Sequence, residues 1–280
     1  MKVSTRRKRN MALIYIITAL FLILFLFPVY WLVISSFQTN GDIMKFPPHF
    51  LPQSITLENY TLLFQDVKYF TYAKNSAIVS LMTVLCCLLI SIFAGYAISR
   101  YRFKGKNLLM TSILNVQIFP TTVIMISLFT FYSDLNLLDT FTGLIIANSV
   151  FTLPFAIWFL KAFFDTIPVS LDESARIDGC GRLQTILRII MPLIRPGLVA
   201  VAIYSFLKAW DDFMFALIIL KDSNKRTLPL GISQSFIGEF SQNYAGMMAI
   251  SVIASVPVVL LFILTQRQLI SGLTAGSVKG

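Results

Sequence analysis

The stretch SLDESARIDGCGRLQTILRIIMP, Ser170–Pro192, decides how this chain folds. It is short and charged, yet it lies between two long apolar runs of the kind that cross a membrane. A polar amphipathic helix in that position needs something outside the lipid against which to pack. The stretch therefore predicts a membrane protein that works together with a soluble partner.

The beginning of this stretch has the pattern of a short capped helix. Ser170 and Glu173 have the S-x-x-E spacing of a capping box, in which each side chain satisfies a backbone amide at the helix start. Pro168 is a natural stop for the preceding span, and Gly179 can take the left-handed conformation that ends a helix. We therefore expect one helix that runs from Ser170 to Asp178.

A second helix is expected from Gly181 to Ile190. Its apolar residues recur at helical spacing and predict one continuous stripe, formed by Leu183, Ile186, Leu187 and Ile190. Pro192 and Pro196 then separate this helix from the next span.

The alternative to a protein partner is a helix that lies on the membrane surface. The first helix carries three acids, Asp172, Glu173 and Asp178. Acids are poor choices beside an anionic cytoplasmic leaflet, so a protein partner is favoured.

The composition is that of an integral membrane protein. The chain has 280 residues, of which 56% are hydrophobic and 13% charged, whereas soluble domains are nearer a quarter charged. Apolar runs of about 20 residues cross a hydrocarbon core of about 30 Å. Such runs lie near residues 12–35, 72–98, 108–131, 141–161, 197–220 and 246–268. We therefore expect an all-α membrane domain with six spans.

Lysine and arginine are distributed unequally over the two sides of these spans. The side that holds both termini carries sixteen of them, in the N-terminal tail, the 2–3 turn, the 4–5 loop and the C-terminal end. The opposite side carries five, namely Lys45, Lys68, Lys221, Lys225 and Arg226. The positive-inside rule therefore places both termini in the cytoplasm. The net charge of +10 is a topology signal, and no nucleic-acid partner is expected.

Proline occurs inside four of the spans, at Pro28, Pro120, Pro154 and Pro257. Each removes a backbone donor, which a membrane helix tolerates when neighbouring groups satisfy the freed carbonyl. Two interpretations follow. The prolines either kink the helices for packing, or they bend helices that frame a cavity.

Enzyme chemistry finds no support in the sequence. The chain lacks a G-x-x-x-x-G-K-[ST] phosphate loop and a G-x-S-x-G elbow, and its single histidine, His49, cannot build a metal site. The three cysteines form no disulfide framework. We expect neither catalysis nor a cofactor or metal in this chain.

The polar stretch resembles a motif of a known family. The string E-S-A-x-x-x-G-x9-I-x-M-P is formed by Glu173, Ser174, Ala175, Gly179, Ile189, Met191 and Pro192. It resembles the EAA loop of permeases from binding-protein-dependent ABC importers, E-A-A-x-x-x-G-x9-I-x-L-P. Ser174 for alanine and Met191 for leucine are mild departures in size.

This resemblance implies a MetI-like, type I importer permease fold. In the family the loop, here residues 168–196, is a cytoplasmic coupling helix that sits in a cleft of an ATPase subunit. The coupling residues implied in this chain are Ser170, Asp172, Glu173, Ser174, Ala175, Asp178, Gly179, Ile189 and Pro192.

The C-terminal string SGLTAGSVKG, Ser271–Gly280, resembles the tail of maltose-type, MalG-like sugar permeases. The segment TLPLGI, Thr227–Ile232, is also typical of that group. In the family the tail reaches between the ATPase subunits. The resemblance thus implies contact residues at Gly272, Leu273, Thr274, Gly276, Lys279 and Gly280. Without it, the tail would be interpreted as a frayed end.

Charged residues interrupt the fifth span near its middle. Lys208, Asp211 and Asp212 each cost roughly 2.5–3.5 kcal/mol there on insertion scales. Lys208 lies three and four residues before the aspartates, so a same-face ion pair is expected. The remaining acid must face water, another subunit or the translocation route.

Two interpretations of these charges stay open. They form either a polar wall or gate of the sugar path, with Tyr204 and Trp210 as stacking surfaces, or an ion network that fixes the helix against a partner permease.

The resemblance implies the permease subunit of an ATP-driven sugar importer in the bacterial inner membrane, with an oligosaccharide as the expected cargo. It implies a second homologous permease, two ATPase subunits that bind ATP and Mg, and an extracytoplasmic binding protein. The chain would comprise a cytoplasmic tail (1–11), a six-span domain (12–268) and a C-terminal tail (269–280).

The main alternative is a self-sufficient secondary transporter or channel that uses the charges of the fifth span. It leaves the polar stretch and the tail unexplained. A scaffold without transport activity is a third option, disfavoured because buried charges and kinked spans are expensive for a passive anchor. Which sugar is carried, and whether this chain or its partner contacts it, the sequence leaves open.

Overall fold

The computed structural model describes residues 2–52, 54–236 and 243–277, with side chains described for residues between 10 and 266. These residues form helices and connecting loops, and none of them forms a β-strand. The all-α expectation is therefore confirmed. The chain divides into two compact units, unit 1 with Met1–Val67 and Ile232–Val256, and unit 2 with Lys68–Gly231 and Pro257–Gly280.

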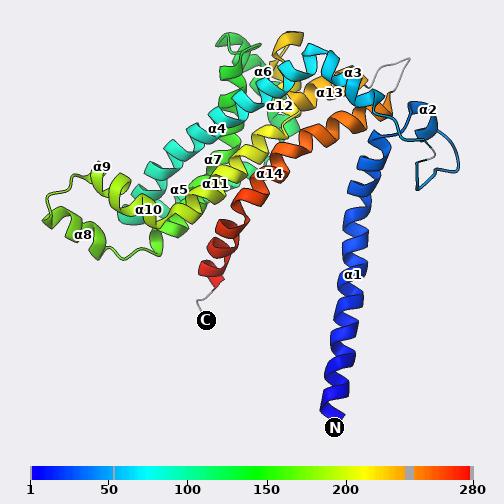
Figure 1. Cartoon of the computed structure of the whole chain (residues 1–280). Coiled ribbons are helices and arrows are strands. Elements are labelled where there is room, and N and C mark those ends of the chain that lie inside the picture. Colours follow the sequence, from blue (N-terminus) through cyan, green and yellow to red (C-terminus); the bar gives the residue numbers. More distant parts are fainter. Residues whose placement is uncertain (1, 53, 237–242, 278–280) are drawn as a thin grey trace. The chain divides into compact units, whose positions relative to one another are not determined.

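Unit 1 begins with three helices, α1 (Lys2–Ser36), α2 (Asn40–Ile43) and α3 (Glu58–Gln65) (Figure 1). No residue in the most apolar stretch of α1 is buried against the rest of the chain. The loop after α1 is held by the Asn59 side-chain amide, which donates to the carbonyls of Ser36 and Gln38 at 3.0 and 2.9 Å. These bonds fix the end of α1, whereas the apolar surface along the rest of the helix is exposed and can contact lipid or another chain.

Unit 2 holds most of the remaining helices. They are α4 (Val67–Arg100), α5 (Lys106–Asn115), η1 (Val116–Ile118), α6 (Thr121–Asp134), α7 (Phe141–Asp165), α8 (Ser170–Ile177), α9 (Arg182–Gln184), the π-helix η2 (Thr185–Ile190), α10 (Met191–Leu193), α11 (Arg195–Trp210), α12 (Met214–Ile219) and η3 (Ser223–Lys225). The helices α13 (Leu228–Phe236) and α14 (Tyr244–Ser277) contribute to both units.

Two apolar clusters pack the interior of unit 2. The first joins α4, α6, α7 and α12 through residues such as Val79, Leu144 and Ile219, which have no exposed surface. The second joins α4, α7 and α11 to the segment α8–α10, and Leu160 and Ile190 are fully buried in it. In Figure 1 the segment α8–α10 lies at one end of the bundle of α4, α7 and α11, and α6 and α12 lie at the other.

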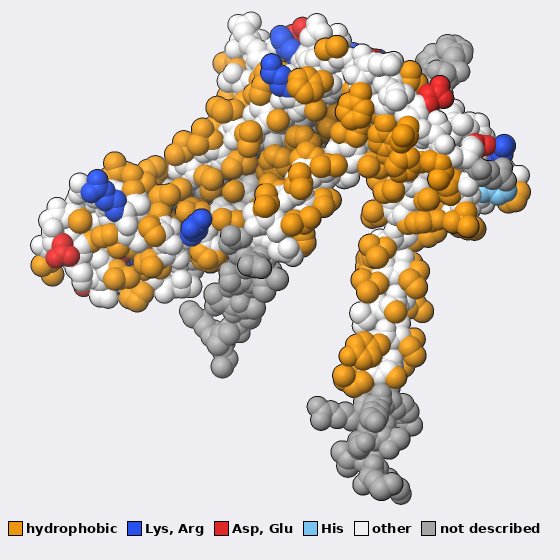
Figure 2. Space-filling model, in the orientation of Figure 1, with side chains coloured by type: hydrophobic (Ala, Val, Ile, Leu, Met, Phe, Trp, Pro, Cys, Tyr) orange, Lys and Arg blue, Asp and Glu red, His pale blue; other side chains and the backbone are white. Residues whose placement is uncertain are grey.

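The surface of unit 2 matches a bilayer. Figure 2 shows hydrophobic side chains over most of the visible face of its helices, whereas charged side chains gather toward the two ends. Many large apolar residues are exposed there, among them Leu81 at 60% and Val150 at 49%. In water such exposure would be costly, so this band is the part of the unit that faces lipid or other subunits.

The predicted spans are confirmed as long helices in four places and corrected in two. Within the described residues, four helices are long and apolar enough to cross a membrane, and two bent helix pairs would raise the number to six. The third predicted span bends by 97° between η1 and α6, where Pro120 cannot donate a backbone hydrogen bond. The fifth is not a continuous helix over 197–220, because it breaks at Asp211–Phe213.

The other prolines lie inside helices. Pro28 is in α1, Pro154 in α7 and Pro257 in α14. The break at Pro120 borders the cavity described below, which agrees with the cavity interpretation for that residue.

Candidate functional site

A cavity of about 600 Å³ lies in unit 2 between the two breaks. Its wall is formed by Val116, Gln117, Phe119, Thr121, Asn148, Phe151, Thr152, Tyr204, Leu207, Lys208, Asp211, Asp212 and Phe215. Irregular backbone is tolerated at membrane depth where it is buried in protein or lines a water-filled space. A cavity of this volume is in the size range of small-molecule sites.

Asp212 stabilises the second break. Its carboxylate accepts the backbone N–H groups of Phe215 and Ala216 at 3.2 and 3.1 Å, which are first-turn donors of α12. Such donors have no partner within their own helix, so a carboxylate at this position satisfies them. Asp212 therefore acts as the cap of α12.

The expected ion pair between Lys208 and the aspartates is not formed. No salt bridge joins Lys208 to Asp211 or Asp212 in the part of the chain that the structure describes. Helical spacing no longer applies beyond Trp210, because α11 ends there. The Lys208 ammonium instead lies 5.8 Å from the centre of the Tyr204 ring.

The predicted path residues are mostly brought together. Tyr204, Lys208, Asp211 and Asp212 line the cavity, and Tyr204 packs on Phe155 with ring centres 4.2 Å apart. Trp210 does not line it; it is 8% exposed and stacks on Phe206.

The α7 side of the cavity is polar and was missed by the sequence argument. Asn148 and Thr152 face it from α7 and are 4% and 2% exposed. The Thr152 hydroxyl donates to the carbonyl of Asn148 at 2.7 Å, whereas the Asn148 side-chain nitrogen finds no acceptor among the described residues. One asparagine and one threonine in an apolar run were too weak a signal to single out.

The start of α8 differs from the predicted capping box. Ser170 is the first residue inside the helix, and the cap position, Val169, offers no side-chain hydrogen bond. The N–H groups of Leu171 and Asp172 are taken by the carbonyls of Pro168 and Val169, and that of Glu173 also by Val169. The backbone before Ser170 already turns, so the Glu173 amide that the Ser170 side chain would bond in a capping box is occupied.

The end of α8 is as predicted. Gly179 has φ +83°, in the left-handed region. Its N–H bonds the carbonyl of Arg176 at 3.0 Å, and the N–H of Cys180 bonds that of Ala175 at 2.9 Å. These two bonds form a Schellman motif, which only glycine enters without strain.

The helix α8 has one buried and one exposed side. Asp172 and Ala175 are 3% and 2% exposed and face the interior of unit 2. Glu173 and Ser174 are exposed, and Ile177 is 86% exposed. The other implied coupling residues vary: Ser170, Asp178, Gly179 and Pro192 are exposed, and Ile189 is half-buried.

The second predicted helix forms, but its apolar stripe is not continuous. Ile186 and Ile190 are buried, whereas Leu183 and Leu187 are 56% and 46% exposed. Thr185–Ile190 is a π-helix, whose wider turn changes which residues share a face. The bend of 85° before α11 agrees with the predicted separation from the next span.

The predicted tail contacts cannot be located by side chain. Gly272, Leu273, Thr274 and Gly276 lie in the last turns of α14, where the backbone alone is described. Lys279 and Gly280 lie outside the described residues.

Residues 87–274 match the family described as "Binding-protein-dependent transport system inner membrane component". This span includes the cavity wall and all of the segment α8–α10. The chain belongs to this family.

Individual relatives agree with this assignment. The chain is 39% identical to the inner membrane ABC transporter permease protein YcjP of Escherichia coli (strain K12), over 94% of each chain. It is 37% identical to the trehalose/maltose transport system permease protein MalG of Thermococcus litoralis, over 92% of this chain and 93% of that one. It is 35% identical to the diacetylchitobiose uptake system permease protein DasC of Streptomyces coelicolor, over 91% and 92%.

A solved structure shares the fold. A chain from a bacterial ABC transporter involved in the import of the polysaccharide alginate superposes with a TM-score of 0.81 at 22% identity, over 94% of this chain and 97% of that chain. The chain is therefore a multi-pass membrane permease with the fold of ABC importer permeases, as the sequence predicted.

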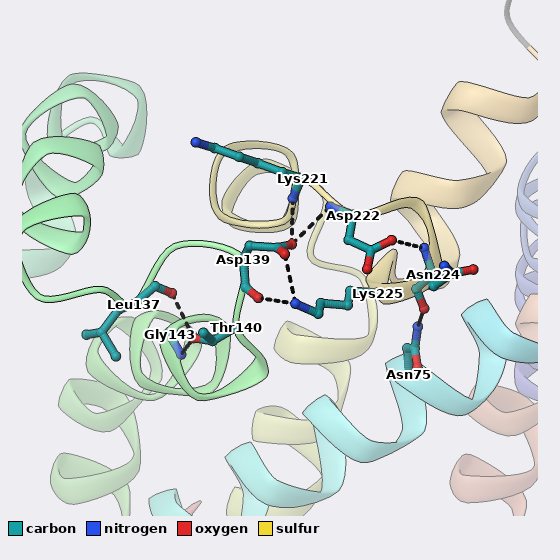
Figure 3. Close-up of polar contacts among 9 residues, drawn as sticks. All are labelled: Asn75, Leu137, Asp139, Thr140, Gly143, Lys221, Asp222, Asn224 and Lys225. Carbon is teal, nitrogen blue, oxygen red and sulfur yellow. Dashed lines mark hydrogen bonds and ion pairs between the residues drawn. The ribbon is translucent and has the colours of Figure 1, made fainter.

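The permease also contains a polar clamp that sequence reasoning missed (Figure 3). The Asp139 carboxylate accepts the backbone N–H groups of Lys221 and Asp222, both at 3.0 Å. The Lys225 ammonium donates to the Asp139 carboxylate and to its carbonyl, each at 2.7 Å. This clamp joins the loop between α6 and α7 to the loop after α12.

The clamp depends on an unusual backbone conformation. Asp139 has φ +56°, which aspartate tolerates better than most residues. Its own N–H donates to the carbonyl of Ile219 at 2.7 Å. The backbone N–H of Asp222 and the Lys225 ammonium lower the pKa of Asp139 from 3.8 to about 2.

Replacing Asp139→Asn removes the charge from the clamp and tests its contribution. Because the folded-state pKa lies below the ordinary value, the carboxylate stabilises the fold above about pH 4, and this stabilisation is lost as the pH falls through about 2. We expect a loss of about 1 kcal/mol at pH 7, since the pair is partly exposed. Thermal unfolding in detergent should show a difference between the two proteins that narrows from pH 4 downward.

Asp134→Asn is the matched control, because Asp134 is exposed at the end of α6 and takes no part in the hydrogen bonds of the clamp. If both substitutions lower the thermal stability equally, or if the loss caused by Asp139→Asn does not change with pH, the clamp does not stabilise the permease.

Proposed function

We propose that this chain is the permease subunit of an ATP-driven, binding-protein-dependent sugar importer. Family membership supports the import of a solute delivered by a binding protein. Relatives named for trehalose/maltose and diacetylchitobiose support a sugar, and more narrowly an oligosaccharide. A solved neighbour of the same fold is described in complex with an alginate pentasaccharide-bound periplasmic protein, which supports a similar binding protein here.

The exposed side of α8 carries this proposal. Ile177, at the end of this polar helix, is 86% exposed and offers an apolar contact to a partner protein. The neighbouring Glu173 and Ser174 are also exposed. A cleft in an ATPase subunit fits this mixed surface, and the spacing of the family loop is intact here, with Ser174 and Met191 as the two departures in residue type.

The remaining subunits follow from the same argument. The bare apolar length of α1 and the lipid-like face of unit 2 leave room for a second homologous permease. Two ATPase subunits, which bind ATP and Mg, would dock on the cytoplasmic side. We place both termini there on the charge count, and the C-terminal tail between the ATPase subunits.

In this mechanism ATP binding draws the ATPase subunits together, and α8 converts that closure into tilting of the spans. Reversing a two-state equilibrium from 1:99 to 99:1 needs about 5.5 kcal/mol of differential binding. A nucleotide held between two subunits is a better source of that energy than a weakly held sugar.

The subunit composition can be measured directly. A tagged chain, purified from native membranes in mild detergent, should bring down an ATPase and a second permease. The expected ratio is two ATPase subunits to one second permease to one tagged chain. Mass spectrometry of the complex, and of any binding protein with its bound sugar, identifies each component. A stable chain that purifies alone and transports sugar in liposomes without ATP would overturn the proposal in favour of a secondary transporter.

Gly179→Asp tests the coupling role of α8. The substitution places aspartate in the left-handed region, which strains it less than most residues, and its main effect is the charge added beside the docking surface. We expect at least a tenfold loss of ATP-dependent uptake and of stimulated ATPase activity, measured in proteoliposomes with the sugar identified above.

Gly105→Asp is a closely matched control for this variant. Gly105 has φ +87° and, like Gly179, open space around its Cα, but it lies in the turn before α5. Gly105→Asp therefore imposes the same backbone strain as Gly179→Asp, but outside the coupling segment. Equal uptake by the two variants would contradict a coupling role for α8.

We further propose that the cavity is part of the sugar path. Two helix breaks meet in its wall together with Tyr204, Asn148 and Lys208, which offer a ring and polar groups to a sugar. Discontinuous helices around a central cavity are a common way in which transporters build a substrate route.

Filling the cavity should block this path. Leu207→Trp adds a bulky ring at the cavity wall, and we expect uptake to fall at least tenfold while the complex still assembles. Leu217→Trp is the control, because Leu217 is 43% exposed on α12 and does not line the cavity. Full uptake by the Leu207→Trp complex, measured as above, would exclude the cavity from the path.

A further inference from the structure

A buried ion pair joins the spanning helix α4 to α8. The Nε of Arg100, the last residue of α4, lies 2.7 Å from Oδ2 of Asp172, and their side chains are 7% and 4% exposed. Tyr96, one turn earlier in α4, donates its hydroxyl to Oδ1 of Asp172 at 2.6 Å. Both oxygens of one α8 carboxylate are therefore engaged by a single spanning helix.

The same arginine also reaches α7. Its Nη1 donates to the carbonyl of Phe164 in the last turn of α7 at 3.1 Å. The two helices touch here, because a Cβ added at Gly95 would lie 3.2 Å from the backbone nitrogen of Lys161 and 3.3 Å from the Phe164 ring. The Arg100 side chain thus bridges three helix ends at a point of close packing.

Stability alone does not account for this arrangement. Taking two charges out of water is expensive, and replacing a buried ion pair with apolar residues of similar size is often neutral or stabilising. The helix α8 is already anchored by apolar contact, since Ala175 is 2% exposed. The charge contact itself is not an aligned hydrogen bond, and direction comes from the two bonds beside it, from the Tyr96 hydroxyl to Asp172 and from Nη1 of Arg100 to the Phe164 carbonyl.

The two sides of α8 have different roles. The side that carries Asp172 is held by α4, while the side that carries Glu173 and Ile177 is exposed. We propose that Tyr96, Arg100 and Asp172, which we call the joint, are positioning residues that make α4 follow α8 when a partner subunit moves it. This inference rests on the proposed function, since it assumes that an ATPase docks on the exposed side.

The test replaces the ion pair without leaving a lone buried charge. The double variant Arg100→Met with Asp172→Leu fills the same space with apolar groups. Replacing only one of the two residues would leave the charge of the other buried and unpaired. The control double variant, Lys161→Met with Asp165→Leu, removes the nearby, partly exposed ion pair of 2.6 Å within α7, together with the hydrogen bond that Ser99 of α4 donates to Asp165, and leaves α8 untouched.

The readout is the movement of α4 itself. An environment-sensitive fluorophore is attached at Leu81→Cys, an α4 position that is 60% exposed, after the three native cysteines are replaced by alanine. The purified complex in lipid nanodiscs receives Mg-ATP, and the change in fluorescence is recorded. Copurification of the ATPase and the melting temperature of each complex are measured in parallel.

We expect the joint variant to assemble with the ATPase and to melt within a few degrees of the parent. Its Mg-ATP-dependent fluorescence change should fall to at most one fifth of the parent value, while the control variant keeps its full change. A full response in the assembled joint variant would overturn the proposal, because it would show a purely structural role.

Arg100→Lys covers the case in which the apolar variant fails to assemble. Lysine keeps the charge but cannot hold Asp172 and the Phe164 carbonyl with one planar fork. We expect assembly with at least a twofold smaller response, and an unchanged response would overturn the joint. A parent complex that does not bind the ATPase, or does not respond to Mg-ATP, would instead contradict the proposed function and the joint with it.

Discussion

The structure depends on the constraint that backbone polar groups cannot go unpaired in hydrocarbon. A long helix without an interior proline, such as α4, meets it within itself. Two spans do not, and they break at Phe119–Pro120 and at Asp211–Phe213. Both breaks face one cavity, and Asp212 satisfies two of the amides that the second break frees. The constraint therefore connects the position of the breaks with the position of the candidate path.

Charged side chains in unit 2 are used mainly at helix ends. Asp172 is held by Arg100 and Tyr96 at the end of α4, and Asp139 by Lys225 and backbone amides between α6 and α7. The apolar clusters between these ends stabilise the unit by burying hydrophobic side chains, but this interaction is non-directional and does not orient the helices. Polar contacts at either end hold the neighbouring helix ends in place, which suits the tilting of whole helices in the proposed mechanism.

Local patterns were predicted well where the chain alone satisfies them. The left-handed Gly179 follows from its place after a helical run, and the structure places it there. The capping box is absent although its residues are present, because the carbonyl of Val169 already accepts the Glu173 amide. The ion pair of Lys208 failed because helical spacing was assumed across a break. In both failures a neighbouring segment decided the outcome.

The sequence by itself determined the class of the protein, the family loop and its spacing, and four of the spans, because hydrophobic length and helical period are local properties. Only the tertiary structure decided that Asp172 faces inward while Ile177 faces outward, since that depends on which helix packs beside α8. It also decided the partners of Asp139, one of which lies 86 residues away. Contacts over such separations leave no spacing pattern in the chain, because they are set by packing in three dimensions.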